Sequence, residues 1–311
     1  MSHAVAEMDR RGVERARVLV TGATGFLGSH LARELVRMGC EVGALVRDGA
    51  ERSRLHDVES RIQMLTGDLV DGARWPETIA RFEPRVVFHL AAYGVNAWVC
   101  DPAQAVLTNV LGTTNLLEAC RPLSLQAFVY AGTSFEEPAP ANAYAASKTA
   151  GWLFGQLYER AHQVPVVGVR PFQVYGPAEA PGRLIPSVIR AALQGREVQA
   201  TEGRQVRDFI FVEDVIEGMI LAAACPEARG KTFNLGTGQG VEVRAVIEQL
   251  MELLGHPVPV AYGALPYRPG ELWNLVADTR SSTEALGWRP RVPLTEGLKR
   301  TVAWYTSHVT A

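Results

Sequence analysis

A glycine-rich turn near the start of this 311-residue chain constrains its fold more than any other feature. The apolar run at residues 18–20 predicts a short buried strand, and apolar residues at helical spacing from Phe26 to Val36 predict a helix. Gly22, Gly25 and Gly28 stand between them. Such a turn lets a phosphate approach the helix N-terminus, where unpaired N–H groups and the helix dipole hold negative charge. The motif predicts a dinucleotide site, although similar turns can be purely structural.

Strand and helix patterns alternate up to Arg170, which is typical of a parallel sheet with helices on both faces. Strands are predicted at residues 17–21, 41–46, 62–65, 86–90, 127–131 and 166–170, and helices at 26–38, 76–82, 101–120 and 143–162. Beyond them, helices are predicted at 184–194, 213–224, 243–254 and 294–307, and strands at 206–212 and 232–235.

Prolines and glycines gather just after Arg170, which indicates a lobe boundary. We expect an α/β fold: a Rossmann-type doubly wound parallel sheet with a smaller, discontinuous C-terminal substrate lobe. Its parts are a disordered tail over residues 1–16 and an NAD(P)-binding domain over 17–172. Residues 173–311 form mainly the substrate lobe, with some segments returning to the first sheet.

Composition argues against several classes of protein. The formal net charge of −2 gives no basic field for nucleic acid. No apolar run reaches the roughly 18 residues of a membrane span, and the polar start resembles no secretory signal. The four cysteines are far apart, without metal-ligand spacing. We therefore expect a cytoplasmic protein with reduced thiols and no metal site, and neither nucleic acid nor membrane as a partner.

Thr133, Tyr144 and Lys148 form the candidate catalytic set. Tyr144 and Lys148 stand one helical turn apart and share a helix face. A phenol has a reference pKa of about 10, and a neighbouring ammonium favours its phenolate. Tyr144 could then act as a general acid and base, and Lys148 could also bind the nicotinamide ribose. Thr133 could hold the same substrate oxygen. A tyrosine and a lysine at this spacing also occur by chance on many helices.

Residues that follow the second and third strands bear on which dinucleotide is bound and on how its adenine is held. NAD-binding chains usually carry an acidic residue after the second strand, where it accepts from the ribose 2′-hydroxyl. Arg47 stands there and could pair with a 2′-phosphate, so NADP(H) is favoured, while Asp48 keeps NAD(H) open. Asp68, after the third strand, could accept from the adenine amino group or cap a turn.

The segment after the fourth strand adds further candidates. Small residues at 91 and 92 would let the dinucleotide lie against the sheet edge, whereas His89 is expected to be packed. The aromatic, glycine-broken segment 93–98 could touch substrate or pack on the surface. Asn109, inside a predicted helix, could brace the site.

Together these motifs resemble the extended short-chain dehydrogenase/reductase family, the group of nucleotide-sugar epimerases, dehydratases and reductases. The resemblance runs from Val18 to about Tyr305. It rests on Thr21-Gly-Ala-Thr-Gly-Phe-Leu-Gly28, Asn109-Val-Leu-Gly-Thr-Thr-Asn-Leu-Leu, Tyr144-Ala-Ala-Ser-Lys148, Arg170-Pro-Phe-Gln-Val-Tyr-Gly-Pro177, Arg207-Asp-Phe-Ile-Phe-Val-Glu-Asp214, Arg268-Pro-Gly-Glu271 and Leu286-Gly-Trp288.

The resemblance implies a set of contacts. The cofactor would be bound by Gly22, Thr24, Gly25, Phe26, Leu27, Gly28, Arg47, Asp68, Leu69, Leu90, Ala91, Ala92, Asn109, Tyr144 and Lys148. The substrate would be bound by Tyr93, Thr133, Gln173, Arg183, Arg207 and Arg268. Arg207 and Arg268 would pair with the diphosphate of a nucleotide sugar, because guanidinium forks match phosphate. A homodimer is expected through the helices at 101–120 and 143–162, whose apolar residues could equally be internal core.

Four departures from the family pattern bear on the reaction. Ser134 and Phe135 replace the Asp-Glu pair of dehydratases, which argues against 4,6-dehydration. Phe135-Glu-Glu-Pro138 follows, where either glutamate could add an acid but is expected to be a solvated loop carboxylate. Gln173 stands where many members carry asparagine. Arg47 replaces the usual acidic residue.

A reductase consumes hydride in every cycle and often draws on NADPH. We therefore expect an NADPH-dependent reductase of a nucleotide-linked keto-deoxysugar, most of all a 4-keto sugar, with the proton supplied by Tyr144. The alternative is an NAD(P)-dependent nucleotide-sugar 4-epimerase, in which Tyr144 first removes the hydroxyl proton. A third hypothesis is a dinucleotide-binding regulator without catalysis, against which the intact catalytic set argues.

Overall fold

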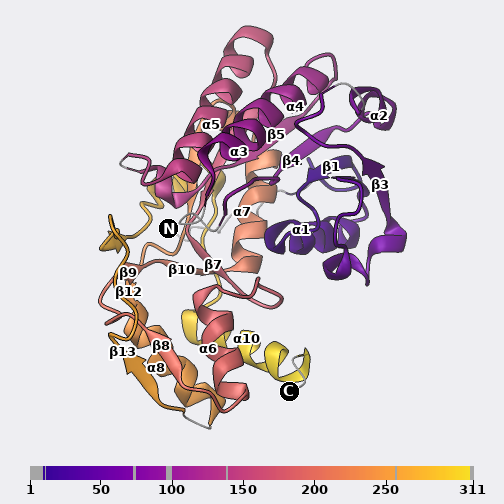
Figure 1. Cartoon of the computed structure of the whole chain (residues 1–311). Helices are drawn as coiled ribbons and strands as arrows, with labels where there is room; N and C mark the ends of the chain where they lie inside the picture. The colour runs from indigo at the N-terminus through magenta and orange to yellow at the C-terminus, as the bar shows by residue number, and fades with distance from the viewer. Residues whose placement is uncertain are drawn as a thin grey trace, which may run out of the picture. The chain divides into compact units, whose positions relative to one another are not determined.

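The computed structural model describes residues 10, 12–72, 75–95, 100–137, 139–255 and 258–308 (Figure 1). The chain divides into two compact units, each assembled from separate stretches of sequence. Unit 1 comprises Met1–Pro171, Ile216–Asn234 and Arg280–Arg289. Unit 2 comprises Phe172–Val215, Leu235–Thr279 and Pro290–Ala311.

Unit 1 is organised around a seven-stranded sheet in the order β11-β6-β5-β4-β1-β2-β3. The strands are β1 Arg17–Thr21, β2 Glu41–Val46, β3 Ile62–Thr66, β4 Val86–His89, β5 Ala127–Ala131, β6 Val166–Pro171 and β11 Thr232–Leu235. All five neighbouring pairs from β3 to β6 run parallel. The α/β fold with a Rossmann-type parallel sheet is thus confirmed. Strand β1 lies between β2 and β4, so the strand order switches there, and such a switch point is where α/β sheets bind ligands.

Helices connect these strands. They are α1 Phe26–Arg37, α2 Pro76–Phe82, α3 Pro102–Ala105, α4 Gly112–Cys120, α5 Ala143–His162, α7 Val212–Ala224 and α9 Arg280–Leu286, and α7 belongs to unit 1 from Ile216 onward. Helix α4 packs between α2 and α5. The helix expected at 101–120 is interrupted by a π-helical stretch, η3 Val106–Leu111, which contains the buried Asn109. Short 3-10 turns occur at η1 Ser53–Leu55, η2 Glu59–Arg61, η4 Ser134–Glu136 and η5 Pro226–Ala228.

Large apolar side chains fill the space between the sheet and its helices. Trp75, Phe128, Tyr130 and Trp152 belong to one buried cluster.

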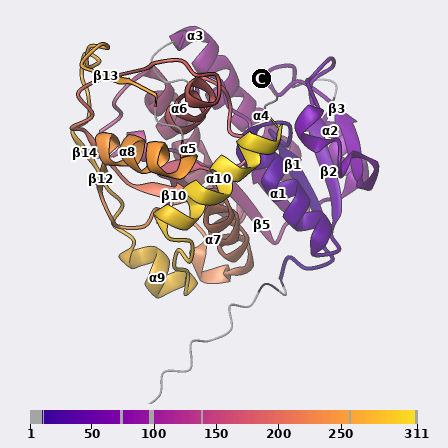
Figure 2. The ribbon, with the colours of Figure 1, turned by 90° about the horizontal axis from the view of Figure 1, so that it is seen from below.

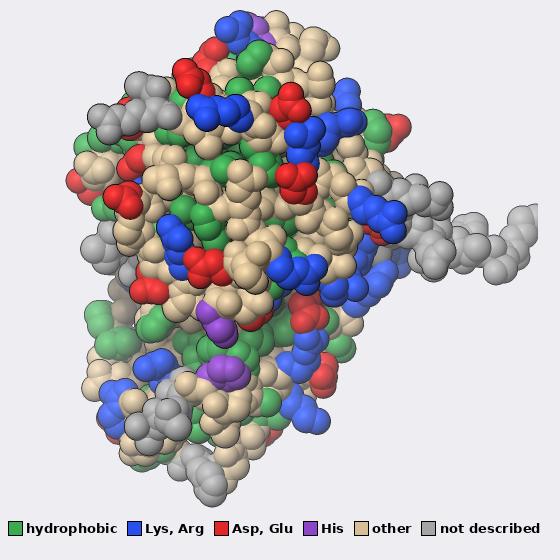
Figure 3. All heavy atoms as spheres, turned by 90° about the vertical axis from the view of Figure 1, so that its right-hand side faces the viewer, with side chains coloured by type: hydrophobic (Ala, Val, Ile, Leu, Met, Phe, Trp, Pro, Cys, Tyr) green, Lys and Arg blue, Asp and Glu red, His purple; other side chains and the backbone are tan. Residues whose placement is uncertain are grey.

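No described helix is both long and apolar enough to cross a membrane. Figure 3 shows basic and acidic side chains interspersed on one face, in keeping with the near-balanced charge of the chain.

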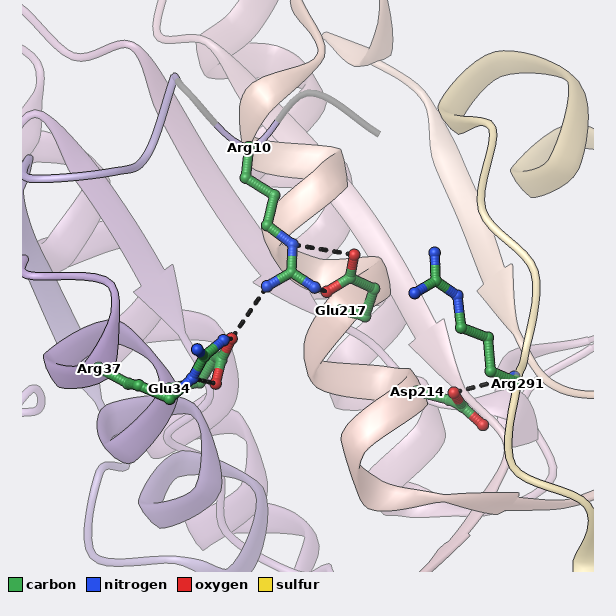
Figure 4. Close-up of polar contacts among 6 residues, drawn as sticks. All are labelled: Arg10, Glu34, Arg37, Asp214, Glu217 and Arg291. Carbon is green, nitrogen blue, oxygen red and sulfur yellow. Dashed lines mark hydrogen bonds and ion pairs between the residues drawn. The ribbon is translucent and has the colours of Figure 1, made fainter. Parts of the chain in front are cut away.

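The end of the expected N-terminal tail is packed against unit 1. The Arg10 guanidinium pairs with Glu217 on α7, and its Nη1 lies 3.0 Å from Glu34 Oε1 on α1 (Figure 4). Arg37 pairs with the same Glu34 carboxylate, whose pKa these partners lower. Val13 is fully buried. The described residues from Arg10 onward therefore differ from the frayed tail expected over 1–16, and residues 1–9 and 11 lie outside the described part.

Unit 2 combines three small sheets with three helices. Strand β7 Gln173–Tyr175 pairs with β10 Phe209–Phe211, β8 Val198–Ala200 with β13 Val260–Tyr262, and β9 Val206–Arg207 with both β12 Val241–Glu242 and β14 Asn274–Leu275. The helices are α6 Leu184–Leu193, α8 Val243–Leu254 and α10 Leu294–His308, and α10 packs against both others (Figure 2). The single strand predicted at 206–212 was wrong, because the chain breaks at Asp208 and enters α7 at Val212.

Asp208 explains this break. Its buried carboxylate accepts from the backbone N–H groups of Thr237, Gly238 and Ala277 and from the Thr237 hydroxyl. One side chain thus ties β9 to the loop after β11 and to the segment after β14.

Candidate active site

The glycine turn between β1 and α1 is closed by backbone packing. Gly22 has a φ of +75°, and a Cβ on it would lie 2.6 Å from the Ala91 nitrogen. A Cβ on Gly28 would lie 2.1 Å from the Gly22 carbonyl oxygen. Gly25 is the N-cap of α1 and gives the helix no side-chain cap. The turn therefore presents an uncapped helix N-terminus, the kind of site that binds phosphate.

The predicted cofactor residues around this turn lie at the ends of the central strands. Thr24, Phe26 and Leu27 belong to the turn or the first turn of α1. Leu90, Ala91 and Ala92 follow β4, where the Ala91 N–H donates to Thr21 Oγ1 at 3.3 Å. Leu69 follows β3 and is buried.

Arg47 and Asp68 line a single pocket of about 590 Å³ in unit 1. Its other walls are Asp48, Gly49, Ala50, Thr66, Gly67, Asp71 and Trp75. Asp68 Oδ1 accepts from the Val70 N–H at 3.0 Å, so the carboxylate caps a turn while it lines the pocket. The structure thus brings together Arg47 and Asp68, the two strand-end residues that were predicted to contact the cofactor.

His89 is part of a directed hydrogen-bond chain. Thr113 Oγ1 donates to the Asn109 carbonyl at 2.7 Å, so it must accept from His89 Nε2 at 2.9 Å. His89 Nδ1 is then the acceptor for Thr21 Oγ1 at 2.7 Å. Complete burial lowers the pKa of His89 well below its usual value, with a smaller contribution from the positive charge of Lys148. The histidine is therefore a neutral, packed link between Thr21 on β1 and Thr113 on α4.

Asn109 clamps the segment after β4. Its Oδ1 accepts from the Tyr93 N–H at 2.8 Å, and its Nδ2 donates to the Tyr93 carbonyl at 2.9 Å. The same Nδ2 lies 2.8 Å from Ser147 Oγ, which in turn donates to the Tyr144 carbonyl. A π-helical stretch aims this side chain, and such bulges recur at functional sites. Asn96, Ala97 and Trp98 of the aromatic segment lie outside the described residues.

The candidate catalytic set lies within unit 1, with Thr133 as the N-cap of η4 and with Tyr144 and Lys148 on α5. Asn142 caps α5 by accepting from the Ala145 N–H at 2.9 Å, so Tyr144 stands in the first helical turn. The positive end of a helix dipole favours an anion at such a position. Thr133 and Tyr144 are each 7% exposed, while Lys148 is 1% exposed.

Lys148 is a buried cation without a hydrogen-bond partner among the described residues. Its Nζ lies 4.1 Å from the centroid of the Tyr130 ring. Burial lowers the pKa of Lys148 to about 8, against an opposing effect of the Glu136 charge. A buried ammonium without an acceptor is costly. Hydroxyl groups of a bound ribose would supply acceptors, so this residue and the glycine cradle both fit a dinucleotide.

Glu136 is the main residue that the sequence analysis misjudged. It is 5% exposed rather than a solvated loop carboxylate. Its Oε1 accepts from the Thr133 N–H at 2.9 Å, and its Oε2 accepts from Arg170 Nε at 2.7 Å. Glu137 is the more exposed of the pair and also contacts Arg170. The available sequence signal was the spacing of Thr133 and Glu136, which is that of a capping box.

The remaining substrate candidates belong to unit 2. Arg207 is buried and pairs with Glu271, and its Nη1 donates to the Leu272 carbonyl at 2.5 Å. Burial lowers the pKa of Arg207, and the charge of nearby Arg268 lowers it further, against the opposing effect of Glu271. Arg207 and Arg268 thus bring two positive charges close together, and guanidinium groups suit an anionic ligand.

Gln173 and Arg183 occupy separate positions in unit 2. Gln173 begins β7 and pairs with β10. Arg183 is the N-cap of α6, and its Nε lies 3.5 Å from Glu179 Oε1. The carboxyl group of Glu179 is buried, and its Oε2 has no hydrogen-bond partner among the described residues.

Comparison with known proteins identifies the family. The model of the NAD dependent epimerase/dehydratase family matches residues 18–236. The UDP-glucose 4-epimerase of Mycolicibacterium smegmatis is 32% identical over 311 residues, covering 93% of this chain and 98% of that protein.

Solved structures agree with this relationship. The UDP-glucose 4-epimerase of Thermus thermophilus, in complex with NAD, has a TM-score of 0.84 at 32% identity and covers 94% of this chain and 100% of its own. The UDP-glucose 4-epimerase of Thermotoga maritima, with UDP-glucose, has a TM-score of 0.86 at 26% identity and covers 94% and 99%. This chain therefore belongs to the NAD dependent epimerase/dehydratase family.

Proposed function

We propose that this protein is a nucleotide-sugar 4-epimerase that keeps one nicotinamide dinucleotide through its catalytic cycle. The observation that carries the proposal is the buried Lys148, which has no hydrogen-bond partner among the described residues and stands one helical turn after Tyr144 on α5. The relatives named above are UDP-glucose 4-epimerases, which favours epimerisation over the keto-deoxysugar reduction expected from Arg47.

The residues of unit 1 would bind the cofactor along the strand ends. Gly22, Gly25 and Gly28 would admit its diphosphate to the N-terminus of α1, and Lys148 Nζ would donate to the nicotinamide ribose. The adenosine end would occupy the pocket of Arg47 and Asp68. We propose NAD(H) as the resident cofactor, since the Thermus thermophilus relative was solved with NAD and Asp48 also lines this pocket. When bound, the nicotinamide supplies a hydride acceptor and donor.

Tyr144 would move the proton. Its phenolate, favoured by the Lys148 ammonium and by the N-terminus of α5, would take the proton of the sugar 4-hydroxyl. Thr133 Oγ1 would hold the same oxygen. After the keto-sugar turns over, its C4 would take the hydride back on the opposite face of the ring, and Tyr144 would return the proton to the same oxygen. One residue thus serves as base and then acid, without net consumption of protons.

Unit 2 would hold the nucleotide end of the substrate. Arg207 and Arg268 would pair with the diphosphate, because guanidinium forks match phosphate and the two positive charges lie close enough for Arg268 to lower the pKa of Arg207. Gln173, Arg183 and Tyr93 are proposed as further substrate contacts. Ser134 and Phe135 supply neither the acid nor the base of a 4,6-dehydration.

A second copy of this chain is the proposed partner. Exposed apolar side chains gather on η3 and α5, namely Val106, Leu107, Leu111, Leu153, Phe154 and Leu157. The η3 and α5 segments pack beside each other, so these residues suit a helical interface.

The four free cysteines suit a reducing compartment such as the cytoplasm.

A panel of hydroxy and keto nucleotide sugars tests the function. Interconversion of two 4-epimers by the purified protein, without net change in nicotinamide absorbance, supports the proposal. Net oxidation of NADPH with a keto-deoxysugar would support the reductase instead. Binding of cofactor and sugar without turnover would favour the regulator.

A further inference from the structure

Glu136 is a buried carboxylate held at the loop after β5. Its two oxygens are each engaged, one by the Thr133 N–H and the other by Arg170 Nε. Thr133 Oγ1 accepts from the Phe135 N–H at 3.4 Å, and together these contacts form a capping box around η4. Removal of the Glu136 carboxylate would leave the Thr133 N–H without this acceptor. The side chain therefore fixes the backbone of a residue in the proposed catalytic set.

Arg170 does not cancel the negative charge at this position. It pairs with both Glu136 and Glu137, so two carboxylates share one guanidinium. The Glu136 side chain is 2% exposed, and the Glu137 side chain is 49% exposed. Water screens the outer carboxylate, whereas the charge on Glu136 acts through the protein interior.

Lys148 is the cation on which this charge acts. Its ammonium contacts the ring of Tyr130 on β5, and Tyr144 stands one helical turn earlier on α5. Helix α5 packs against η4, which carries Glu136, and the charge of Lys148 also acts on the buried, neutral His89 on β4. Burial disfavours the ammonium, and the charge on Glu136 opposes that effect. Tyr130 offers its ring face, and its burial raises the pKa of its own hydroxyl, so it supplies no anion.

We propose that Glu136 is a positioning residue of this site, whose carboxylate fixes the Thr133 backbone and keeps Lys148 charged. It acts through these two residues and not on the substrate, because both of its oxygens are engaged. The consequence for catalysis rests on the proposed function, but the charge state of Lys148 can be measured without turnover.

The lysine content of the chain makes that measurement direct. Lys148, Lys231 and Lys299 are its only lysines, so selective 13C labelling of lysine gives three side-chain signals. Lys148→Arg identifies the signal of Lys148 in the full-length protein. We expect Lys148 to titrate near pH 8 in the parent protein. In Glu136→Gln the titration should move down by roughly half a pH unit or more, since Gln keeps the size but loses the charge.

Two matched variants separate charge from structure. Glu137→Gln removes the exposed carboxylate that shares Arg170 and should leave the Lys148 titration in place. Glu136→Asp retains the charge and should titrate near the parent protein, even if the shorter side chain weakens the contact with Thr133. An unchanged Lys148 titration in a folded Glu136→Gln protein, or an equal shift in Glu137→Gln, overturns the proposal. If Glu136→Gln does not fold, loss of the parent titration in Glu136→Asp overturns it as well.

Activity provides the second readout. If Lys148 must be protonated for turnover, the alkaline limb of the kcat profile should move to lower pH in Glu136→Gln, with about threefold less activity above the parent midpoint. A uniform loss at every pH, without movement of the limb, contradicts the electrostatic role. A parent protein that turns over no nucleotide sugar contradicts the proposed function and leaves the lysine titration to decide the role of Glu136.

Discussion

Tyr130 contacts both the backbone carbonyl and the side-chain ammonium of Lys148. The Tyr130 hydroxyl donates to the Lys148 carbonyl at 2.8 Å, and the Lys148 Nζ lies 4.1 Å from the centroid of the Tyr130 ring. The ring stabilises the charge through its electron-rich face and accepts no conventional hydrogen bond from it. The N–H donors of the ammonium thus stay available for a ligand, although the side chain is held in place.

Tyr144→Phe is expected to abolish turnover with little effect on cofactor binding. The six-membered aromatic ring is the same in both proteins, and only the hydroxyl is lost, so packing in the first turn of α5 is retained. Loss of a general acid and base typically costs about 10²–10⁴-fold in rate. Single-turnover kinetics and cofactor titration measure the two effects separately. Substantial residual turnover would exclude the proposed role of Tyr144.

Gly28→Ala should damage the cofactor turn more than Gly25→Ala does. A Cβ on Gly28 would lie 2.1 Å from the Gly22 carbonyl oxygen, whereas a Cβ on Gly25 would approach the same atom only to 3.2 Å. Backbone cannot yield as a flexible side chain does, so we expect a loss of about 2–4 kcal/mol in unfolding free energy for Gly28→Ala. Thermal unfolding of both variants without cofactor tests the difference. Equal melting temperatures would show that the turn tolerates a side chain at Gly28.

The sequence predicted most of the parallel sheet because each strand is a short apolar run between turn residues. It also predicted the glycine turn, whose close contacts only glycine can make. Asp208 shows a feature that local sequence patterns do not predict. Its buried carboxylate organises three backbone segments far apart in sequence, and it divides an apolar stretch that reads locally as one strand.

The two residues whose burial the sequence predicted wrongly are held by partners far away along the chain. Glu136 looked like a surface carboxylate because no basic residue stands near it in the sequence, whereas its ion-pair partner Arg170 lies 34 residues away. Arg10 reads as a tail residue, but its partners are Glu34 and Glu217. A charged side chain is costly to bury without such partners, and local sequence patterns carry no information about partners far along the chain.

Arg47→Asp should change the choice between NADP and NAD. Arg47 lines the same pocket as Asp48, Asp68 and Asp71, so its replacement by aspartate leaves four carboxylates there. These would repel a 2′-phosphate but could accept from a 2′-hydroxyl. We expect the ratio of NADP to NAD dissociation constants to rise about tenfold or more. Titration of the apoprotein with both cofactors measures the ratio, and an unchanged value would exclude a phosphate contact by Arg47.

Arg268→Ala should raise KM for the nucleotide sugar with little change in kcat. A diphosphate contact remote from the reacting carbon contributes equally to the ground state and the transition state. Arg207→Ala is expected to raise KM as well, and also to lower stability, because it removes the ion-pair partner of Glu271, whose side chain is only 8% exposed. Steady-state kinetics with a nucleoside diphosphate as competitive inhibitor check both. Unchanged KM and inhibition constants in Arg268→Ala would reject the diphosphate assignment.

Glu179→Gln should stabilise the protein increasingly as pH rises. The Glu179 carboxyl is buried with one oxygen unpartnered, and burial raises its pKa to about 8, against the opposing effect of Arg183. In the unfolded chain the same group has an ordinary pKa of 4.5. Between these values the folded protein holds a proton that the unfolded chain has lost, so the stability that this group contributes falls as pH increases.

Glutamine does not titrate, so the variant escapes this loss. The unfolding free energy of Glu179→Gln minus that of the parent should grow by roughly 1.4 kcal/mol per pH unit within the window from 4.5 to 8. Urea unfolding at several pH values in this window measures the difference, and the exposed Glu197→Gln serves as the control, for which we expect a flat line. A flat line for Glu179→Gln too would mean that Glu179 is ionised in the folded protein, with Arg183 outweighing its burial.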